Sequence, residues 1–217
     1  MPILPPLEQH YSGRMTGMIF LLKKPRVEQD MKKIIVLNMI SLMLLAPAAR
    51  ATCPSPHANI QVSKPDSLYI ENFDGTVTDQ ATSLVWAKCS LGQTWVDNTA
   101  DDGSDDSCVG TATTYTWKGA LDAARSSSDS AYLGKTGWRV PNVKELGSLL
   151  ENACSSPAIN TGIFPSTVNA IYWTSSPYAG SPGTDLEAWY VGFLSSGEIF
   201  RELKSKLYRV RLVREGE

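Results

Sequence analysis

The side chains that could carry a reaction are few, and most of them are carboxylates. His10 precedes the apolar segment described below and His57 lies in a proline-rich stretch, so a Ser-His-Asp triad or an imidazole metal centre lacks its parts. Glu145, Glu151 and Glu187 could supply a carboxylate pair like that of glycoside hydrolases. No spacing singles out a pair, and Glu145 suits a helix N-terminus. We therefore expect no enzymatic activity, with a carboxylate-based hydrolase of cell-surface polysaccharide as the alternative.

The four cysteines predict two disulfides. None of Cys53, Cys89, Cys108 and Cys154 has the C-x-x-C or C-x-x-H spacing of a zinc site, so we expect no metal and no cofactor. Four cysteines permit three pairings. We favour Cys89 with Cys108, because this pair closes a local acidic loop. We favour Cys53 with Cys154, because this pair ties the N-terminal segment to the body of the domain.

Aromatic and arginine side chains could bind a ligand without any reaction. The six tryptophans suit sugar stacking and suit a core equally well, and we expect most of them in the core. Trp95, beside an acidic segment, is the candidate for an exposed indole. Arg139 is either a buried, paired structural residue, which we favour, or a recognition group for an acidic ligand. Tyr178 and Tyr190 complete the predicted ligand-binding set.

The segment 97–106 is strongly acidic and has no apolar period, so we expect an exposed loop. Calcium is the functional alternative. Aligning Gly103 with the glycine of an EF-hand loop places Ala100 and Val109 at ligand positions, so that motif fails. A solvated loop is the favoured interpretation.

The N-terminal region has the pattern of a secretory signal peptide. Residues 31–51 combine Lys32 and Lys33, an apolar run at 34–45 and a small-residue site ending at Ala51, which predicts cleavage before Thr52. The apolar run is too short for a hydrocarbon core about 30 Å thick, so we expect no membrane span in the mature form. Residues 1–30 are interpreted as an upstream extension. The protein is expected to be exported, to the periplasm or outside the cell.

The remaining chain, residues 52–217, is acidic. It holds 13 Lys and Arg against 19 Asp and Glu, a net charge of −6. Binding to a phosphate backbone needs a basic patch, so a nucleic-acid partner is disfavoured. Residues 52–66 are interpreted as a mature N-terminal segment ahead of a single domain.

The elements of that domain predict an α+β fold with an antiparallel sheet. Thr116 can cap a helix that starts at Trp117 and ends at the serine run 126–128. A second helix starts at Pro141 or Asn142 and continues to about residue 152. Asp74-Gly75 predicts a tight hairpin turn with positive φ angles. Strand patterns occupy residues 68–73, 76–79, 83–87, 171–175, 188–194, 198–203 and 207–213. In the last of these, alternation places the arginines on one face and most apolar residues on the other.

The order of several motifs resembles the Lcl C-terminal domain family over roughly residues 67–214. The motifs are Asp74-Gly75-Thr76-Val77-Thr78-Asp79, Leu84-Val85-Trp86, Gly92-Gln93-Thr94-Trp95, Gly137-Trp138-Arg139-Val140-Pro141-Asn142, Tyr172-Trp173-Thr174-Ser175-Ser176 and Val210-Arg211-Leu212-Val213-Arg214. The resemblance implies a C-type-lectin-like fold related to formylglycine-generating enzymes, with two helices packed on short antiparallel sheets. It implies binding more than catalysis. Where the family commonly has Thr-Gly-Leu, this chain has Thr82-Ser83-Leu84.

Neither related fold brings its activity with it. The Glu-Pro-Asn, Gln-Pro-Asp and Trp-Asn-Asp triplets with which calcium-dependent lectins hold sugar are missing. Formylglycine-generating enzymes use a pair of reactive cysteines late in the chain, and here no cysteine follows Cys154. We expect a secreted recognition or adhesion module that binds a glycan or a surface protein through loops around Trp95, Tyr178 and Tyr190. A structural or oligomerising role in a surface assembly is a further alternative, and the sequence leaves the oligomeric state open.

Overall fold

The computed structural model describes residues 51–97, 106–180 and 186–216. They belong to the second of two compact units of the chain, Ala48–Glu217. Within these ranges the predicted α+β fold is confirmed, with two α-helices and several short antiparallel sheets. No helix in these ranges is long and apolar enough to cross a membrane. The predicted extension 1–30 and, apart from Ala51, the predicted signal peptide 31–51 lie outside the described residues, as do positions 98–105 of the acidic segment.

A four-stranded sheet contains the N-terminal meander and the last strand, in the order β11-β4-β3-β2. Its strands are β2 (Tyr69–Glu71), β3 (Thr76–Asp79), β4 (Leu84–Ala87) and β11 (Val213–Glu215), and the short 3-10 helix η1 (Asp66–Leu68) precedes them. Val77 pairs with Glu71 on one side and with Trp86 on the other, so these three side chains share a face. In the turn between β2 and β3, Phe73 and Gly75 have the positive φ angles. The prediction of a positive φ at Asp74 was wrong, because its carboxylate accepts a hydrogen bond from the amide of Thr76 instead.

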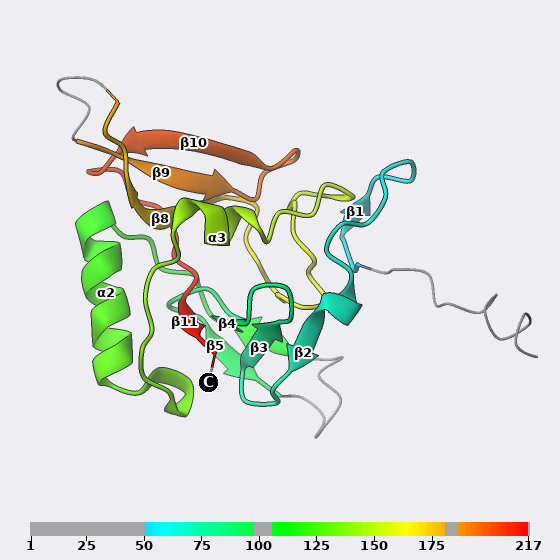
Figure 1. Cartoon of the computed structure of the whole chain (residues 1–217), viewed down its shortest axis with the longest axis horizontal. Helices are drawn as coiled ribbons and strands as arrows, with labels where there is room; N and C mark the ends of the chain where they lie inside the picture. The colour runs from blue at the N-terminus through cyan, green and yellow to red at the C-terminus, as the bar shows by residue number, and fades with distance from the viewer. Residues whose placement is uncertain (1–50, 98–105, 181–185, 217) are drawn as a thin grey trace, which may run out of the picture. The chain divides into compact units, whose positions relative to one another are not determined.

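A three-stranded sheet follows in the order β10-β9-β8. Its strands are β8 (Ile171–Pro177), β9 (Glu187–Gly192) and β10 (Glu198–Leu203). The outer side of β8 is covered, because the amide of Trp173 donates to the carbonyl of Arg209 at 2.9 Å. The outer side of β10 pairs with no strand in the described ranges. In Figure 1 this sheet forms a layer above α3.

Two small sheets lie next to the disulfides. β1 (Ser55–Pro56) pairs with β7 (Cys154–Ser155), and β5 (Thr94–Val96) pairs with β6 (Ser107–Val109). Both predicted pairings are confirmed: Cys53 bonds Cys154 and Cys89 bonds Cys108, with Cα atoms 5.3 and 5.5 Å apart. The predicted N-terminal segment 52–66 is therefore fastened to the rest of the unit.

The first helix begins at its predicted residue, and the second begins one residue after Asn142, the later of its two predicted starts. α2 (Trp117–Asp129) starts after Thr116, whose hydroxyl accepts from the amide of Gly119 at 3.2 Å. α3 (Val143–Gly147) is five residues long, and the prediction that it continues to about residue 152 was wrong. The chain turns after Gly147 because Leu150 pairs with Ile159 instead of extending the helix. A 3-10 turn, η2 (Tyr132–Gly134), lies between them.

Two hydrophobic clusters lie on the opposite faces of the three-stranded sheet. Tyr172 and Val191 belong to the cluster that includes Leu146 and Leu149, beside α3. Trp173 and Tyr190, on the other face, belong to the cluster that includes Ala120 and Ala124 of α2. The sheet is thus buried on both sides near β8 and becomes exposed toward β10.

The segment predicted as the strand 207–213 is mostly irregular, and only β11 forms at its end. The predicted separation of arginines and apolar residues onto two faces fails at Arg211, which is fully buried like its neighbours Val210 and Leu212. Its guanidinium donates to the carbonyls of Ala87 and Lys88 and to the hydroxyl of Thr167. These acceptors compensate the buried charge, while burial lowers the pKa of Arg211 to about 10.

Candidate functional site

The predicted ligand-binding residues lie on separate parts of the fold. Tyr178 directly follows β8 and Tyr190 lies on β9, so both belong to the three-stranded sheet. Trp95 lies on β5, which Figure 1 shows at the end of the domain away from β10. Arg139 lies between η2 and α3. The structure brings Tyr178 and Tyr190 onto one sheet and leaves Trp95 and Arg139 elsewhere.

Trp95 is half-buried and packs against a turn. A Cβ atom added at Gly75 would lie 3.0 Å from Cδ2 of Trp95, so the indole covers the backbone of the β2–β3 turn closely. Its Nε1 is buried and makes no hydrogen bond within the described residues. This environment is that of a packing residue, and it leaves only part of the ring to solvent.

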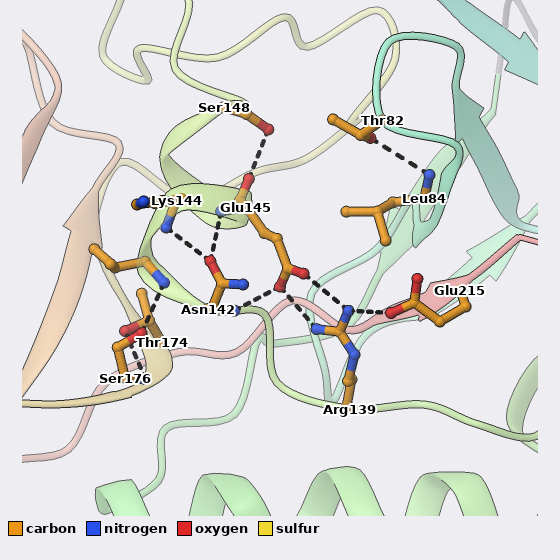
Figure 2. A network of polar contacts seen from close by, with 11 residues as sticks. Thr82, Leu84, Arg139, Asn142, Lys144, Glu145, Ser148, Thr174, Ser176 and Glu215 are labelled. Carbon is orange, nitrogen blue, oxygen red and sulfur yellow. Dashed lines mark hydrogen bonds and ion pairs between the residues drawn. The ribbon is translucent and has the colours of Figure 1, made fainter.

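Arg139 lies in a network of polar contacts at the start of α3 (Figure 2). Its guanidinium forms two hydrogen bonds with Glu145, at 2.7 and 2.9 Å, and a third with Glu215 at 2.5 Å. The hydrogen bonds to Glu145 are the main reason why the pKa of Arg139 is raised. The predicted pairing of Arg139 is present, but its side chain is 36 % exposed and not buried. An acidic ligand would have to compete with two carboxylates already bound to it.

Glu145 also closes the N-terminus of α3. The side chain of Asn142 accepts from the amides of Lys144 and Glu145, and Glu145 in turn accepts from the amide of Asn142 at 2.7 Å (Figure 2). Burial raises the pKa of Glu145, but the hydrogen bonds from Arg139 and Asn142 outweigh it, and the net shift is downward. Glu145 is therefore held as a carboxylate.

The other two catalytic candidates also have structural partners. Glu151 is fully buried and accepts from the amides of Ser63, Lys64 and Ala153. Glu187 pairs with Arg201 at 2.7 Å. Across the described ranges no group of three or more His, Cys, Asp or Glu side chains could hold a metal ion. Nothing in these contacts supports the hydrolase alternative.

One face of the three-stranded sheet carries a cluster around Arg201. Trp189 pairs with Arg201 across β9 and β10. The ring of Tyr178 packs edge-on against Trp189, with centroids 5.4 Å apart. The guanidinium carbon of Arg201 lies 4.3 Å from the centroid of Tyr178. Glu187 and Tyr178 together fix the position of this arginine at the surface.

The opposite face carries Tyr190 in contact with other rings. Its centroid lies 5.8 Å from that of Tyr208 and 6.5 Å from that of Phe200. Its hydroxyl lies 3.2 Å from Oε1 of Glu198 and donates to it. Burial, followed by the Glu198 carboxylate, raises the pKa of Tyr190 to about 12. Tyr190 is only 8 % exposed, so little of its ring is open to a ligand, and it packs against Phe200. Its predicted part in ligand binding stays a prediction.

Large apolar side chains are exposed around β10, and the sequence patterns did not single them out. Five of the nine most exposed large apolar residues in the described ranges lie between residues 186 and 207. We call them the β10 patch: Leu186 (63 % exposed), Ile199 (45 %), Phe200 (54 %), Leu203 (41 %) and Leu207 (59 %). Ile199 and Phe200 point to opposite faces, so the patch surrounds the unpaired edge of β10. The sequence contains one signal for this patch, which is that apolar residues occupy both faces of the predicted strand 198–203. This signal indicates an exposed patch only if β10 is known to be an edge strand.

Comparison with known protein families gives one match, to the Lcl C-terminal domain over residues 75–214. This range contains α2, α3, the β10 patch and the pair Arg139–Glu145, while Glu215 lies one residue beyond it. The predicted family is thereby confirmed, with a match that begins at residue 75 and not at 67. The predicted relation to C-type lectins stays a prediction. A search of the curated proteins finds no match to the chain.

Proposed function

This chain belongs to the Lcl C-terminal domain family, and we propose that it is an exported, non-enzymatic recognition and adhesion module that binds a cell-surface protein or glycan through the β10 patch. The observation that carries the proposal is that five exposed apolar side chains lie on β10 or near its ends, while the outer edge of β10 pairs with no strand in the part of the chain that the structure describes. Monomeric proteins rarely leave large apolar areas exposed unless a partner covers them.

Export is supported by the two disulfides. Structural disulfides persist in the periplasm and outside the cell and are rare in reducing compartments. Both Cys53–Cys154 and Cys89–Cys108 lie after the predicted cleavage site between Ala51 and Thr52. The bond at Cys53 also fastens the predicted mature N-terminus to the folded unit.

A protein partner is favoured over a glycan by the chemistry of the patch. Four of its five members, Leu186, Ile199, Leu203 and Leu207, are aliphatic and offer no flat ring for a sugar to stack on. Arg201 already lies over the ring of Tyr178. An apolar centre beside an arginine and aromatic rings is the composition of protein interfaces.

The experiment is a binding screen of the purified mature protein, residues 52–217, on arrays of bacterial and host surface proteins and of glycans. Phe200→Ser is the test variant, because Phe200 is the most exposed aromatic residue of the patch. Ile70→Ser is the matched control: Ile70 is 51 % exposed against 54 % for Phe200, and it lies on β2, outside the patch.

We expect a protein to bind, Phe200→Ser to weaken its affinity about tenfold or more, and Ile70→Ser to leave it unchanged. Circular dichroism and thermal melts would show that both variants remain folded. Equal affinities of the two variants for the bound partner would show that the β10 patch is not the binding surface. Binding to glycans alone would show that the partner is a glycan and not a protein. A stable oligomer that binds nothing on the arrays would favour the structural or oligomerising alternative.

A further inference from the structure

A buried cluster of one amine and two carboxylates lies outside the surface described above. Nζ of Lys88 forms ion pairs with Glu71 and with Asp106. The side chains of Lys88 and Asp106 are 1 % and 3 % exposed, and that of Glu71 is 19 % exposed. In two other lysine ion pairs, Lys118–Asp122 and Lys135–Asp74, both members are more exposed than these three side chains.

Rigid elements hold the three groups together. Lys88 directly follows β4, and its amide donates to the carbonyl of Gly75 at 3.0 Å. Glu71 ends β2 and lies on the same face of the sheet as Trp86, two residues before Lys88. The disulfide Cys89–Cys108 joins the residue after Lys88 to the residue two positions after Asp106. The amine and the carboxyl group are thus kept in contact by the backbone on both sides.

This arrangement is costly while the groups remain separate ions. One ammonium faces two carboxylates where water is largely excluded, so the cluster carries an uncompensated charge in a poorly solvated place. The neutral amine is a nucleophile, and its attack on the carboxyl carbon needs no diffusion, because the reactants are already in contact.

We propose that Lys88 and Asp106 condense into an intramolecular amide, with Glu71 carrying the proton. The bond formed joins Nζ of Lys88 to Cγ of Asp106, and the bond broken is one C–O bond of Asp106. Glu71 relays two protons, one after the other, from the nitrogen of Lys88 to the departing oxygen of Asp106, which leaves as water. An ammonium and a carboxylate are consumed, one amide and one water are produced, and Glu71 returns to its initial state. No oxidant or cofactor is required.

The amide closes a covalent loop over residues 88–106. The disulfide Cys89–Cys108 already closes an overlapping loop over residues 89–108. Unlike the disulfide, the amide survives reduction. The buried charge of Lys88 and that of Asp106 are removed, which relieves the cost of burying them.

The test is mass spectrometry of the folded mature protein after full reduction and denaturation. The expected mass is lower by one water than the sequence mass. Peptide mapping is expected to find a cross-linked pair of peptides that contain Lys88 and Asp106, and no tryptic cleavage after Lys88. Glu71→Gln keeps the shape of the proton carrier and removes its function, so its mass is expected to be that of the uncondensed chain.

Two controls distinguish this amide from an unspecific loss of water. The half-buried pair Lys135–Asp74, whose side chains are 27 % and 34 % exposed, is expected to yield no cross-linked peptide, because both groups keep contact with water. Asp74-Gly75 can lose water by closing a ring on its own backbone, so a lower mass without a Lys88–Asp106 peptide would overturn the proposal. A wild-type protein that is folded by circular dichroism and has the full sequence mass would also overturn it.

Discussion

At the residue scale, the contact between Arg139 and Glu145 links two parts of the chain. Glu145 simultaneously caps α3 and binds a guanidinium that also reaches Glu215 at the end of β11 (Figure 2). Its pKa is lowered in the folded protein. A carboxyl group with a lowered folded pKa stabilises the fold at pH values above its unfolded pKa, and that contribution is lost as the pH falls through the folded value.

We predict that Glu145→Gln lowers the free energy of unfolding by about 1–2 kcal/mol at neutral pH, because the charged cap and part of a partly screened ion pair are lost. The difference from wild type should shrink as the pH falls below the unfolded value near 4.5 and vanish below the lowered folded pKa. Urea denaturation across this pH range measures it. Asp122→Asn, in the exposed pair Lys118–Asp122, is the control and should change little at any pH. A Glu145→Gln defect that persists unchanged in acid would contradict the assignment.

Single residues were predictable where a local rule decides their role. The Asn142–Glu145 cap and the pairing of Arg139 follow from spacing along a few residues of the chain. Arg211 was not predictable in this way, because its acceptors Ala87, Lys88 and Thr167 come from distant segments. Burial of an arginine depends on long-range packing, which alternation along one strand does not contain.

At the scale of elements, the turn between β3 and β4 holds a residue other than glycine in a strained backbone conformation. Ser83 has a φ of +60°, in the left-handed region that costs a residue with a Cβ about 1–2 kcal/mol. The amide of Ser83 donates to Asp79 at 2.8 Å and its carbonyl accepts from Gly216 at 3.1 Å, so the backbone conformation is fixed from both sides. Family members commonly have glycine at the corresponding position, which this geometry suits.

We predict that Ser83→Gly raises the free energy of unfolding by about 0.5 kcal/mol, since relief of the left-handed strain exceeds the entropy that glycine adds to the unfolded chain. Ser83→Val should lower it by about 1–2 kcal/mol. Thr82→Gly is the control in the same turn: Thr82 has no positive φ, so glycine there should only destabilise. Thermal and urea unfolding of the three variants would measure these differences, and a destabilised Ser83→Gly would contradict the argument.

The starts of elements were easier to predict than their ends and their edges. Thr116 caps α2 where the sequence predicts, and α3 begins at Val143, one residue after Asn142, the later of its two predicted starts. α3 stops early and the predicted strand 207–213 breaks up because both segments form bridges to other parts of the chain, Leu150 to Ile159 and Tyr208 to Tyr115. Which strand becomes an unpaired edge depends on the order of strands in the sheet, so the β10 patch became apparent only in the folded structure.

At the scale of the whole molecule, covalent bonds hold together short elements that bury little surface individually. Cys53–Cys154 spans 101 positions and Cys89–Cys108 spans 19. If a disulfide acts by restricting the unfolded chain, the first contributes about 4.7 kcal/mol and the second about 3.3 kcal/mol. Replacing Cys53 and Cys154 with alanine should therefore cost more stability than replacing Cys89 and Cys108.

The proposed amide changes the second of these values. If Lys88 and Asp106 are joined, the segment that Cys89–Cys108 closes is already closed, and Cys89→Ala/Cys108→Ala should cost about 1 kcal/mol or less. In the Glu71→Gln background, where no amide forms, the same double replacement should cost about 3 kcal/mol. Urea denaturation of the four proteins gives this coupling directly. Equal costs in both backgrounds would show that the disulfide closes this loop alone, and that Lys88 and Asp106 remain an ion pair.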